Sequence, residues 1–477
     1  MEKIIAQVAS KVVEEIVNYI LEKGISEIGE TAEGLLDILK EGALSLLSTA
    51  IQAVDDAIWN DKKGRKEEGL SVKARNIERV CVTGIGELRY GRTYYQYADG
   101  TKIFLVDHLI GIEPYERFTK ELCAKLVESA ASCSMAKAAE ASGVSVSRQS
   151  VNNKILAMKD VVTDISRVEE TPEELHIFAD EDHAHLRPKR DAIVPLVTVT
   201  EGIDTTNDKR HKTINAVHFE GCGMRNEAFV ENITAAIYER YDVDRIRNIY
   251  IHADGANWIR KLGELLPNTV FIMDGFHAEK QFKILTRLKG AKSHAGPLKT
   301  ALKDNNREAF MNCCETILQD QDEDGEKKLA DLVSYFRNNW ESIAERYSGQ
   351  HCGSCTEPLV GHILSERLSR DPMAWTKEGL AKMAMLRIYV TNGNKVTAES
   401  IRISQNKRDR THEFEVRKDG LAKYKEYADE QVRKFMSGNL DWSIFENSST
   451  FPGLTDGKTT GTAMLLNALS HHSKVAS

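Results

Sequence analysis

Five short apolar runs between residues 175 and 274 constrain the fold of this chain more than any other feature. The runs occupy residues 175–180, 193–203, 213–221, 248–254 and 269–274. The first three follow one another at the spacing of strands joined in hairpins. A helical pattern at about 226–240 precedes the fourth run, and another that begins near residue 257 precedes the fifth. This order predicts an α/β domain with a mixed sheet, in which three antiparallel strands are followed by alternating helices and strands.

Three of these runs end on an aspartate, and two of these aspartates are candidate metal ligands. The element order of the runs is that of an RNase H-like domain, and α/β sheets present functional groups at the ends of their strands. Asp180 ends the first run and Asp254 ends the fourth. In an extended strand, Asp180 and Asp182 point to one face and Glu181 points to the other. Asp180 is therefore the expected metal ligand with Asp182 beside it, or the reverse.

Clustered carboxylates at strand ends favour a metal site, because such a cluster is costly to bury without cations. Magnesium prefers hard oxygen ligands, usually one or two carboxylates together with water and substrate phosphates. Two such ions roughly 4 Å apart activate the attacking oxygen and stabilise the leaving oxygen in a displacement at phosphorus. A third carboxylate from a following helix completes that arrangement, and Glu357 begins a predicted helix. We therefore expect two Mg²⁺ ions, with Mn²⁺ as the substitute, at Asp180, Asp254 and Glu357. A solvated acidic strand end is the alternative.

A basic helix follows the last of the five runs. Asp274 ends that run, and His277 lies on the turn behind it. The next basic residues, Lys280, Lys283 and Arg287, share one helix face at spacings of three and four. A basic helix that leaves the edge of an active site would contact phosphates of a DNA backbone. We take His277 and these three residues as candidate DNA contacts, with an ordinary solvated helix face as the alternative.

The segment 113–165 has the pattern of a helix-turn-helix. A helix through Val127 leads into a short helix at 134–142. After Gly143, a helix with a serine cap covers 147–155. This last helix carries donors that can reach base edges or phosphates, namely Arg148, Gln149, Asn152, Asn153 and Lys154. We expect it to recognise DNA; three packed helices without a DNA contact give the same pattern.

The N-terminal region has a different pattern. Apolar residues at helical spacing over residues 2–58 predict two amphipathic helices, separated at Gly24 and Gly29. Such apolar stripes usually bury a face, so we expect packing or self-association here rather than DNA contact. A charged linker at 61–69 follows, and alternating residues in 76–106 then predict a β-hairpin or small sheet.

The composition is that of a globular protein. The chain of 477 residues has 41% hydrophobic and 29% charged residues, which is enough to bury several cores. Its apolar runs fall far short of the roughly 20 residues that span a membrane, and we expect a cytoplasmic protein without a membrane partner. The net charge of −8 argues against non-specific coating of nucleic acid, but a local basic face is sufficient for DNA binding. Only Cys352 and Cys355 have the spacing of zinc ligands, and without a second pair we expect reduced thiols.

Four motifs stand in order along the chain. They are 178-FADEDHAHL-186, 252-HADGANWI-259, 274-DGFHAEK-280 and a longer segment that begins 355-CTEPLVGHILSERLSR-370. Together they resemble a bacterial family, the Lre-type insertion-sequence transposases, over most of residues 70–390. The resemblance implies a DDE recombinase that uses Asp180, Asp254 and Glu357 as its metal ligands. It also implies a helical insertion at about 278–350, and the gap before Glu357 is indeed too long for a plain loop.

The third ligand has a competitor. Pro358 stands where relatives are expected to have a glycine, although proline is acceptable in a first helical turn. Glu366 lies nine residues beyond Glu357 and is the alternative third ligand.

From these features we expect a bacterial insertion-sequence transposase. It would bind terminal inverted repeats and perform magnesium-dependent cleavage and strand transfer on double-stranded DNA, as a homodimer or a larger assembly. An RNase H-like nuclease without strand transfer and a catalytically inactive DNA-binding relative are the alternatives. The expected regions are 1–60 for the N-terminal helices, 70–112 for the small β segment, 113–165 for the helix-turn-helix, 172–395 for the catalytic domain and 396–477 for a partly helical tail.

Overall fold

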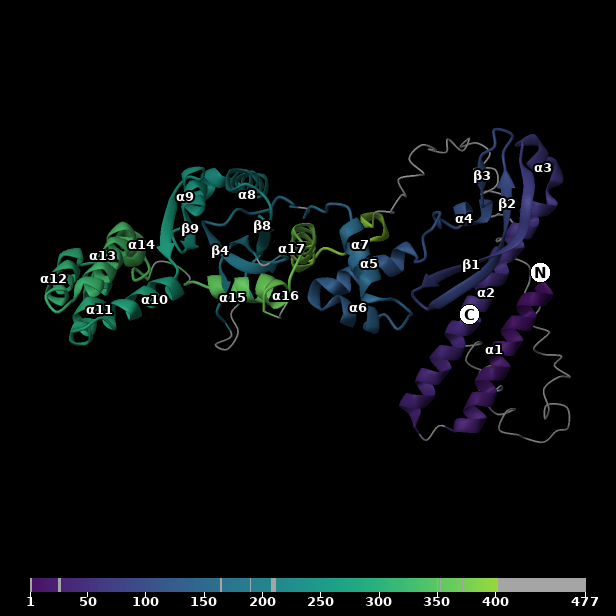
Figure 1. Ribbon diagram of the computed structural model, residues 1–477, viewed down its shortest axis with the longest axis horizontal. Helices are drawn as coiled ribbons and strands as arrows, with labels where there is room; N and C mark the ends of the chain where they lie inside the picture. Colours follow the sequence, from purple (N-terminus) through teal and green to yellow (C-terminus); the bar gives the residue numbers. More distant parts are fainter. Residues whose placement is uncertain are drawn as a thin grey trace. The chain divides into compact units, whose positions relative to one another are not determined.

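The computed structural model describes eight stretches of the chain (Figure 1), namely residues 2–24, 27–163, 165–188, 190–206, 212–349, 351, 353–370 and 373–401. These residues divide into two compact units. The first holds the chain up to residue 123 together with 139–147. The second holds 124–138 and the chain from 148 to the end of the described residues. The expected tail at 396–477 lies outside the described residues from position 402 onward.

Two long helices and a small sheet form most of the first unit. The helices are α1 (Glu2–Lys23) and α2 (Ile28–Asn60). The antiparallel sheet contains β1 (Ser71–Thr83), β2 (Gly86–Gln96) and β3 (Lys102–Ile103), in that order, and α4 (Leu105–Leu109) follows it. Ile58 of α2 packs with Leu88 and Tyr95 of the sheet in one hydrophobic core. The expected regions 1–60 and 70–112 therefore fold around a common core.

Two expectations about this unit are wrong. Gly29 lies inside α2, and the two long helices separate at Gly24, whose φ of 70° is a conformation that glycine adopts without strain. Residues 61–69 are not a plain linker, because Lys62–Glu67 form the short helix α3. The buried Arg65 side chain donates to two carbonyl oxygens at the end of α2, which holds this segment against the long helix.

The helix-turn-helix segment consists of three short helices. They are α5 (Lys120–Ser132), α6 (Met135–Ala141) and α7 (Arg148–Ala157). Gly143 lies in the turn between α6 and α7 with a φ of 67°, so the chain has the expected helices and glycine turn. α7 packs against α17 (Lys377–Thr391), a helix of the second unit.

A mixed sheet of five strands forms the centre of the second unit. Its strands are β4 (Glu174–Leu186), β5 (Arg190–Thr200), β8 (Val217–Glu220), β9 (Asn248–Ala253) and β10 (Thr269–Met273). The spatial order is β10-β9-β4-β5-β8. β5 is antiparallel to both of its neighbours, whereas β4, β9 and β10 run parallel. The predicted mixed α/β class is confirmed.

The third predicted strand, 213–221, is shorter than expected. Only Val217–Glu220 joins the large sheet as β8. The first residue of this run, Thr213, belongs to β7 (Lys212–Thr213), which pairs with β6 (Ile203–Asp204) in a separate two-stranded ribbon.

Alternation along β4 gives the sheet two different faces. Leu175, Ile177 and Ala179 point into a hydrophobic core with the helices α8 (Asn226–Arg240) and α9 (Asn257–Glu264). The 3-10 turn η1 (Val243–Arg245) lies between α8 and β9. Asp180 and Asp182 alternate with these core residues and therefore point to the opposite face. Figure 1 shows α8 and α9 on one side of the sheet and the later helices α15 and α16 on the other.

A helical insertion with its own core follows β10. Its helices are α10 (Gly275–Thr286), η2 (Ala291–His294), α11 (Ala295–Lys303), α12 (Arg307–Leu318), α13 (Glu323–Asn338) and α14 (Trp340–Glu345). Phe310, Phe336 and Trp340 pack in the centre of this core. The chain then continues through α15 (Thr356–Val360), the π-helical turn η3 (Gly361–Ser365), α16 (Glu366–Leu368), α17 and η4 (Ala398–Ser400).

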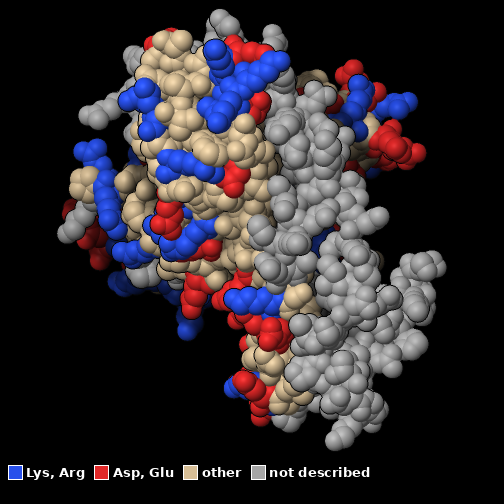
Figure 2. Space-filling model, turned by 90° about the vertical axis from the view of Figure 1, so that its right-hand side faces the viewer, with Lys and Arg blue, Asp and Glu red and all other residues tan. Residues whose placement is uncertain are grey.

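Two further properties of the described residues are the charge on their surface and the apolarity of their helices. On the face drawn in Figure 2, Lys and Arg side chains are interspersed with Asp and Glu side chains over the described residues. Within the described part of the chain, none of the helices has the length and apolarity that crossing a membrane requires.

Candidate metal centre

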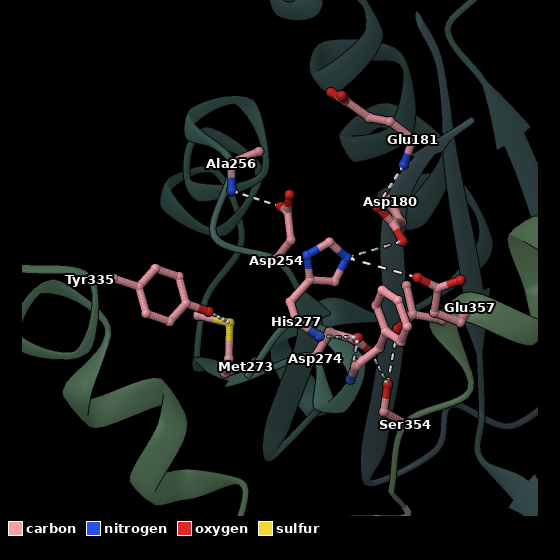
Figure 3. A network of polar contacts seen from close by, with 12 residues as sticks. Asp180, Glu181, Asp254, Ala256, Met273, Asp274, His277, Tyr335, Ser354 and Glu357 are labelled. Carbon is pink, nitrogen blue, oxygen red and sulfur yellow. Dashed lines mark hydrogen bonds and ion pairs between the residues drawn. The ribbon is translucent and has the colours of Figure 1, made fainter. Parts of the chain in front are cut away.

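Three side chains from distant parts of the chain meet beside β4, just beyond the last residue of β4 that pairs with β9 (Figure 3). Asp180 comes from β4, His277 from the first turn of α10, and Glu357 from the first turn of α15. One potential ligand atom from each lies within 4.8 Å of the other two. The Nε2 atom of His277 lies 4.0 Å from Asp180 Oδ2 and 3.9 Å from Glu357 Oε1. The imidazole thus stands between the two carboxylates.

Asp254 lies beside this group and outside it. β9 runs parallel to β4 with His252 opposite Phe178, so two residues further on Asp254 comes level with Asp180. The Oδ1 atom of Asp254 accepts a hydrogen bond of 2.9 Å from the amide of Ala256. Among the described residues, the group with ligand atoms within 4.8 Å of one another contains Asp180, His277 and Glu357.

Asp180 is buried, with 9% of its surface exposed, among other acids. Burial, together with the negative charges of Asp254 and Glu357, raises the pKa of its carboxyl to about 6. The hydrogen bond from the Glu181 amide and the nearby His277 act in the opposite direction. Carboxylates that repel one another in a buried place are stabilised by a cation, which restores their charged form.

Asp274 holds the helix that carries His277. It is buried at the end of β10 and caps α10, where its Oδ2 atom accepts hydrogen bonds from the amides of Phe276 and His277 at 2.9 and 3.4 Å. Its Oδ1 atom accepts a hydrogen bond of 2.7 Å from the Ser354 hydroxyl. Ser354 also lies 3.0 Å from the hydroxyl of Thr356, the residue before Glu357. One carboxylate therefore bonds to both segments that supply the site.

The structure separates Asp182 from Asp180. The Oδ1 atom of Asp182 accepts hydrogen bonds of 2.9 Å from the hydroxyls of Ser365 and Ser369. These serines lie beyond Glu357 along the helical segment that starts at α15. Asp182 thus anchors that segment to β4, and it is not part of the group around His277.

Glu366, the alternative third ligand, lies on the outer side of the same segment. Its carboxylate is 42% exposed and pairs with His362 at 2.8 Å and with Arg370 at 3.5 Å. Glu357 is the glutamate that the structure brings to Asp180, and Pro358 occupies the first turn of α15, a position where proline is tolerated.

The expected DNA-contacting residues lie on two helices. Lys280 and Lys283 on α10 and Arg287, which follows the helix as its C-cap, are exposed. His277 is part of the acidic group rather than of this outer face.

On α7, two apolar residues, Val151 and Ile155, are buried. The helix exposes Arg148, Gln149 and Asn153, and Gln149 donates to Asn153 across 2.9 Å. Two of the expected contacts, Asn152 and Lys154, are half-buried.

Sequence reasoning missed the roles of Asp274 and Ser354. Asp274 was visible as the end of an apolar run followed by a helix, which is the pattern of an N-cap. The pairing with Ser354, 80 residues away, has no local signal.

The donor atoms of this centre fit a hard divalent cation. Asp180 and Glu357 offer carboxylate oxygens that face each other across the imidazole of His277, and Asp254 adds a third carboxylate beside them. Such oxygen ligands suit Mg²⁺ and Mn²⁺. His277 supplies a nitrogen that can bind a metal or, when protonated, donate to a substrate oxygen.

Comparison with known proteins shows the family of this chain. The model of an uncharacterised protein family, UPF0236, matches residues 21–405. UPF0236 protein TTE0402 of Caldanaerobacter subterraneus subsp. tengcongensis is 30% identical over 404 residues, which cover 82% of this chain and 80% of that protein. UPF0236 protein TTE2489 of the same organism is 30% identical over 388 residues, covering 80% and 82%. A single name covers eleven separate loci of that genome for another relative. The chain belongs to the UPF0236 family, which has many paralogues in one genome.

Proposed function

We propose that this member of the UPF0236 family is a DNA transposase that cleaves and joins DNA with divalent metal ions. The observation that carries the proposal is the meeting of Asp180, Glu357 and His277 within 4.8 Å, with Asp254 beside them. Three carboxylates from two parallel strands and a later helix support this proposal, because the divalent ions of two-metal phosphoryl transfer take oxygen ligands.

The sheet supports an RNase H-like assignment of the second unit. Three antiparallel strands, β4, β5 and β8, come first in the chain, and β9 and β10 then join β4 on its other side. A helical insertion separates β10 from the helix with Glu357. Both features agree with a DDE transposase, and so does the presence of many paralogues in one genome, which is expected of a mobile element.

The side chains divide the work in this proposal. Asp180, Asp254 and Glu357 would hold Mg²⁺ or Mn²⁺, which when bound supplies Lewis-acid activation of the attacking oxygen and stabilises the leaving oxygen. Asp274 keeps His277 beside the reacting phosphate, and Asp182 holds the helical segment behind Glu357.

Further contacts with DNA would lie outside this centre. The exposed basic residues of α10 would contact backbone phosphates. The exposed face of α7 would read the ends of the element, and two ends brought together imply a homodimer or a larger assembly.

A strand-transfer assay tests the proposal. The substrate is duplex DNA that carries the sequences flanking the gene, with Mg²⁺ or Mn²⁺. We expect Asp180→Asn, Asp254→Asn and Glu357→Gln each to lower cleavage and joining by roughly 100-fold or more while DNA binding is retained. Glu366→Gln, which changes an exposed carboxylate outside the group, is the matched control and should keep most activity.

Three other outcomes would replace the proposal. Cleavage without joining would make the protein a nuclease. DNA binding without metal-dependent cleavage would make it an inactive relative. Undiminished joining in all three carboxylate variants would show that the catalytic centre lies elsewhere.

A further inference from the structure

A cavity of about 500 Å³ opens directly behind Asp254, within the second unit. Gly255 and Ala256 line it on the side of the metal centre, and Arg260 lines it from α9. The opposite wall belongs to the helical insertion, through the end of α13 and the start of α14. The cavity is therefore formed by the core of the domain and the insertion together.

Three arginines converge on this cavity from three separate helices. Arg260 comes from α9, Arg307 from the start of α12, and Arg337 from α13. Glu341 and Glu345 are the acids of the lining, so guanidinium groups outnumber carboxylates. Among the described residues, neither Arg307 nor Arg337 forms an ion pair, and both side chains are exposed.

Arg260 is oriented by the contact between core and insertion. It donates to the carbonyl oxygen of Gly255 at 3.3 Å and to Asn339 Oδ1 of the insertion at 2.9 Å. Gly255 has a φ of 95°, and a Cβ atom there would lie 3.1 Å from the same Asn339 oxygen. Glycine thus permits the close approach that brings Arg260 to the cavity.

We propose that this cavity binds a backbone phosphate of the DNA strand that is cut at the metal centre around Asp180. Like charges brought to one place repel, and an anion that joins them removes that cost. Guanidinium groups also match phosphate geometry with paired donors. The inference rests on the proposed function and gives the insertion a part in it, because Arg307 and Arg337 both belong to the insertion. None of these arginines was a candidate from the sequence.

The test compares the full chain with a variant that carries Arg260→Gln, Arg307→Gln and Arg337→Gln. Binding to a labelled 40-base-pair duplex of arbitrary sequence is measured by fluorescence anisotropy over a range of salt concentrations. Each lost phosphate contact lowers the slope of log affinity against log salt by about 1. Because the three arginines bind one phosphate, we expect a slope smaller by about 1 and an affinity at least roughly tenfold weaker.

The control variant carries Arg245→Gln and Arg247→Gln. These exposed arginines lie at the start of β9, the end opposite Asp254, and should leave slope and affinity unchanged. A second readout does not need DNA. Replacing chloride by inorganic phosphate at equal ionic strength should raise the Tm of the unsubstituted chain more than that of the triple variant.

Two results would overturn the inference. One is a triple variant that matches the unsubstituted chain in salt slope and in its response to phosphate. The other is an unsubstituted chain that responds to neither duplex nor phosphate. Failure of the proposed function is seen separately, as strand transfer that survives Asp180→Asn.

Discussion

Ser354 donates a hydrogen bond of 2.7 Å to Asp274, and this bond links two segments that are 80 residues apart. Asp274 ends β10 and caps the helix of His277, while Ser354 lies just before the helix of Glu357. The helical insertion lies between these two residues in the sequence: it begins directly after Asp274 and ends before Ser354. The bond therefore closes the insertion at its base and sets the distance between His277 and Glu357.

Removing the Asp274 carboxylate should misplace both neighbours. We expect Asp274→Ala to lower metal-dependent cleavage by roughly 10- to 100-fold, as the loss of residues that orient metal ligands commonly does. Asp274→Asn should retain much of the activity, because its amide oxygen can cap α10 and its amide nitrogen can donate to Ser354. Cleavage rates at saturating metal and DNA measure both effects.

Asp322→Ala is the matched control for that experiment. Asp322 caps α13 in the same insertion and accepts a hydrogen bond of 2.9 Å from the Gly325 amide, and it is not part of the group formed by Asp180, His277 and Glu357. Its loss should cost about 1 kcal/mol of stability and little activity. An Asp274→Asn variant as inactive as Asp180→Asn would contradict the positioning role and make Asp274 a ligand.

Local patterns predicted much of the second unit and the positions of two acids. The strands could be predicted because their apolar runs are short and separated by turns, and Asp254 because it directly follows such a strand. Asp180 also ends an apolar run, but β4 continues through it to Leu186, so it lies inside the strand and not at its end. The third strand was predicted too long because residues 213–216 share the composition of a strand, whereas Thr213 pairs in the separate ribbon and residues 214–216 join neither sheet. The periodicity of apolar residues predicts whether a segment is a helix or a strand more reliably than it predicts the first and last residues of that segment.

The remaining features depend on contacts between distant segments. The choice between Asp180 and Asp182 could not be made from the strand, because both point to one face; Ser365 and Ser369 decide it from a helix 183 and 187 residues away. His277 and the three cavity arginines have the sequence environment of any exposed basic residue. Packing of the insertion against the sheet brings His277 to the two carboxylates and the arginines to the cavity.

The anchoring of Asp182 predicts a loss of stability. The double variant Ser365→Ala and Ser369→Ala removes both donors from a buried carboxylate, which should cost about 1–3 kcal/mol in the free energy of unfolding measured with urea. Ser293→Ala, which removes an exposed hydroxyl bonded to the Gly290 carbonyl, should change it by less than about 0.5 kcal/mol. Equal effects of the two variants would show that the Asp182 bonds do not hold the segment.

Divalent metal should stabilise the folded chain through the centre. A cation that binds the native state alone at a hundredfold excess over its Kd contributes about 2.7 kcal/mol, which raises Tm by several degrees. We expect Mn²⁺ and Mg²⁺ to raise the Tm of the unsubstituted chain and a chelator to reverse the rise. Asp180→Asn should abolish the shift, whereas Asp182→Asn, on the same strand, should keep it. A shift of equal size in Asp180→Asn would place the bound metal elsewhere.

Two neighbours on β8 predict opposite pH dependences of stability. Burial lowers the pKa of His218 to about 4, below its unfolded value, so the unfolded chain binds a proton first. The stability that His218 contributes is present above about pH 6.5 and is lost as the pH falls. Burial raises the pKa of Glu220 to about 7. Its contribution is complete below the unfolded pKa of about 4.5 and is lost as the pH rises through 7.

Comparing variants at about pH 7.5 and about pH 5.5 separates the two contributions, each worth roughly 1–2 kcal/mol over this interval. His218→Asn keeps an acceptor or donor for Thr198, which lies 2.8 Å from the imidazole Nδ1 atom. It should gain stability relative to the unsubstituted chain as the pH falls. Glu220→Gln should lose stability in the same comparison, because the unsubstituted glutamate takes up a proton on folding. Urea unfolding at the two pH values measures both differences, and equal signs for the two variants would contradict the assignment of these buried groups.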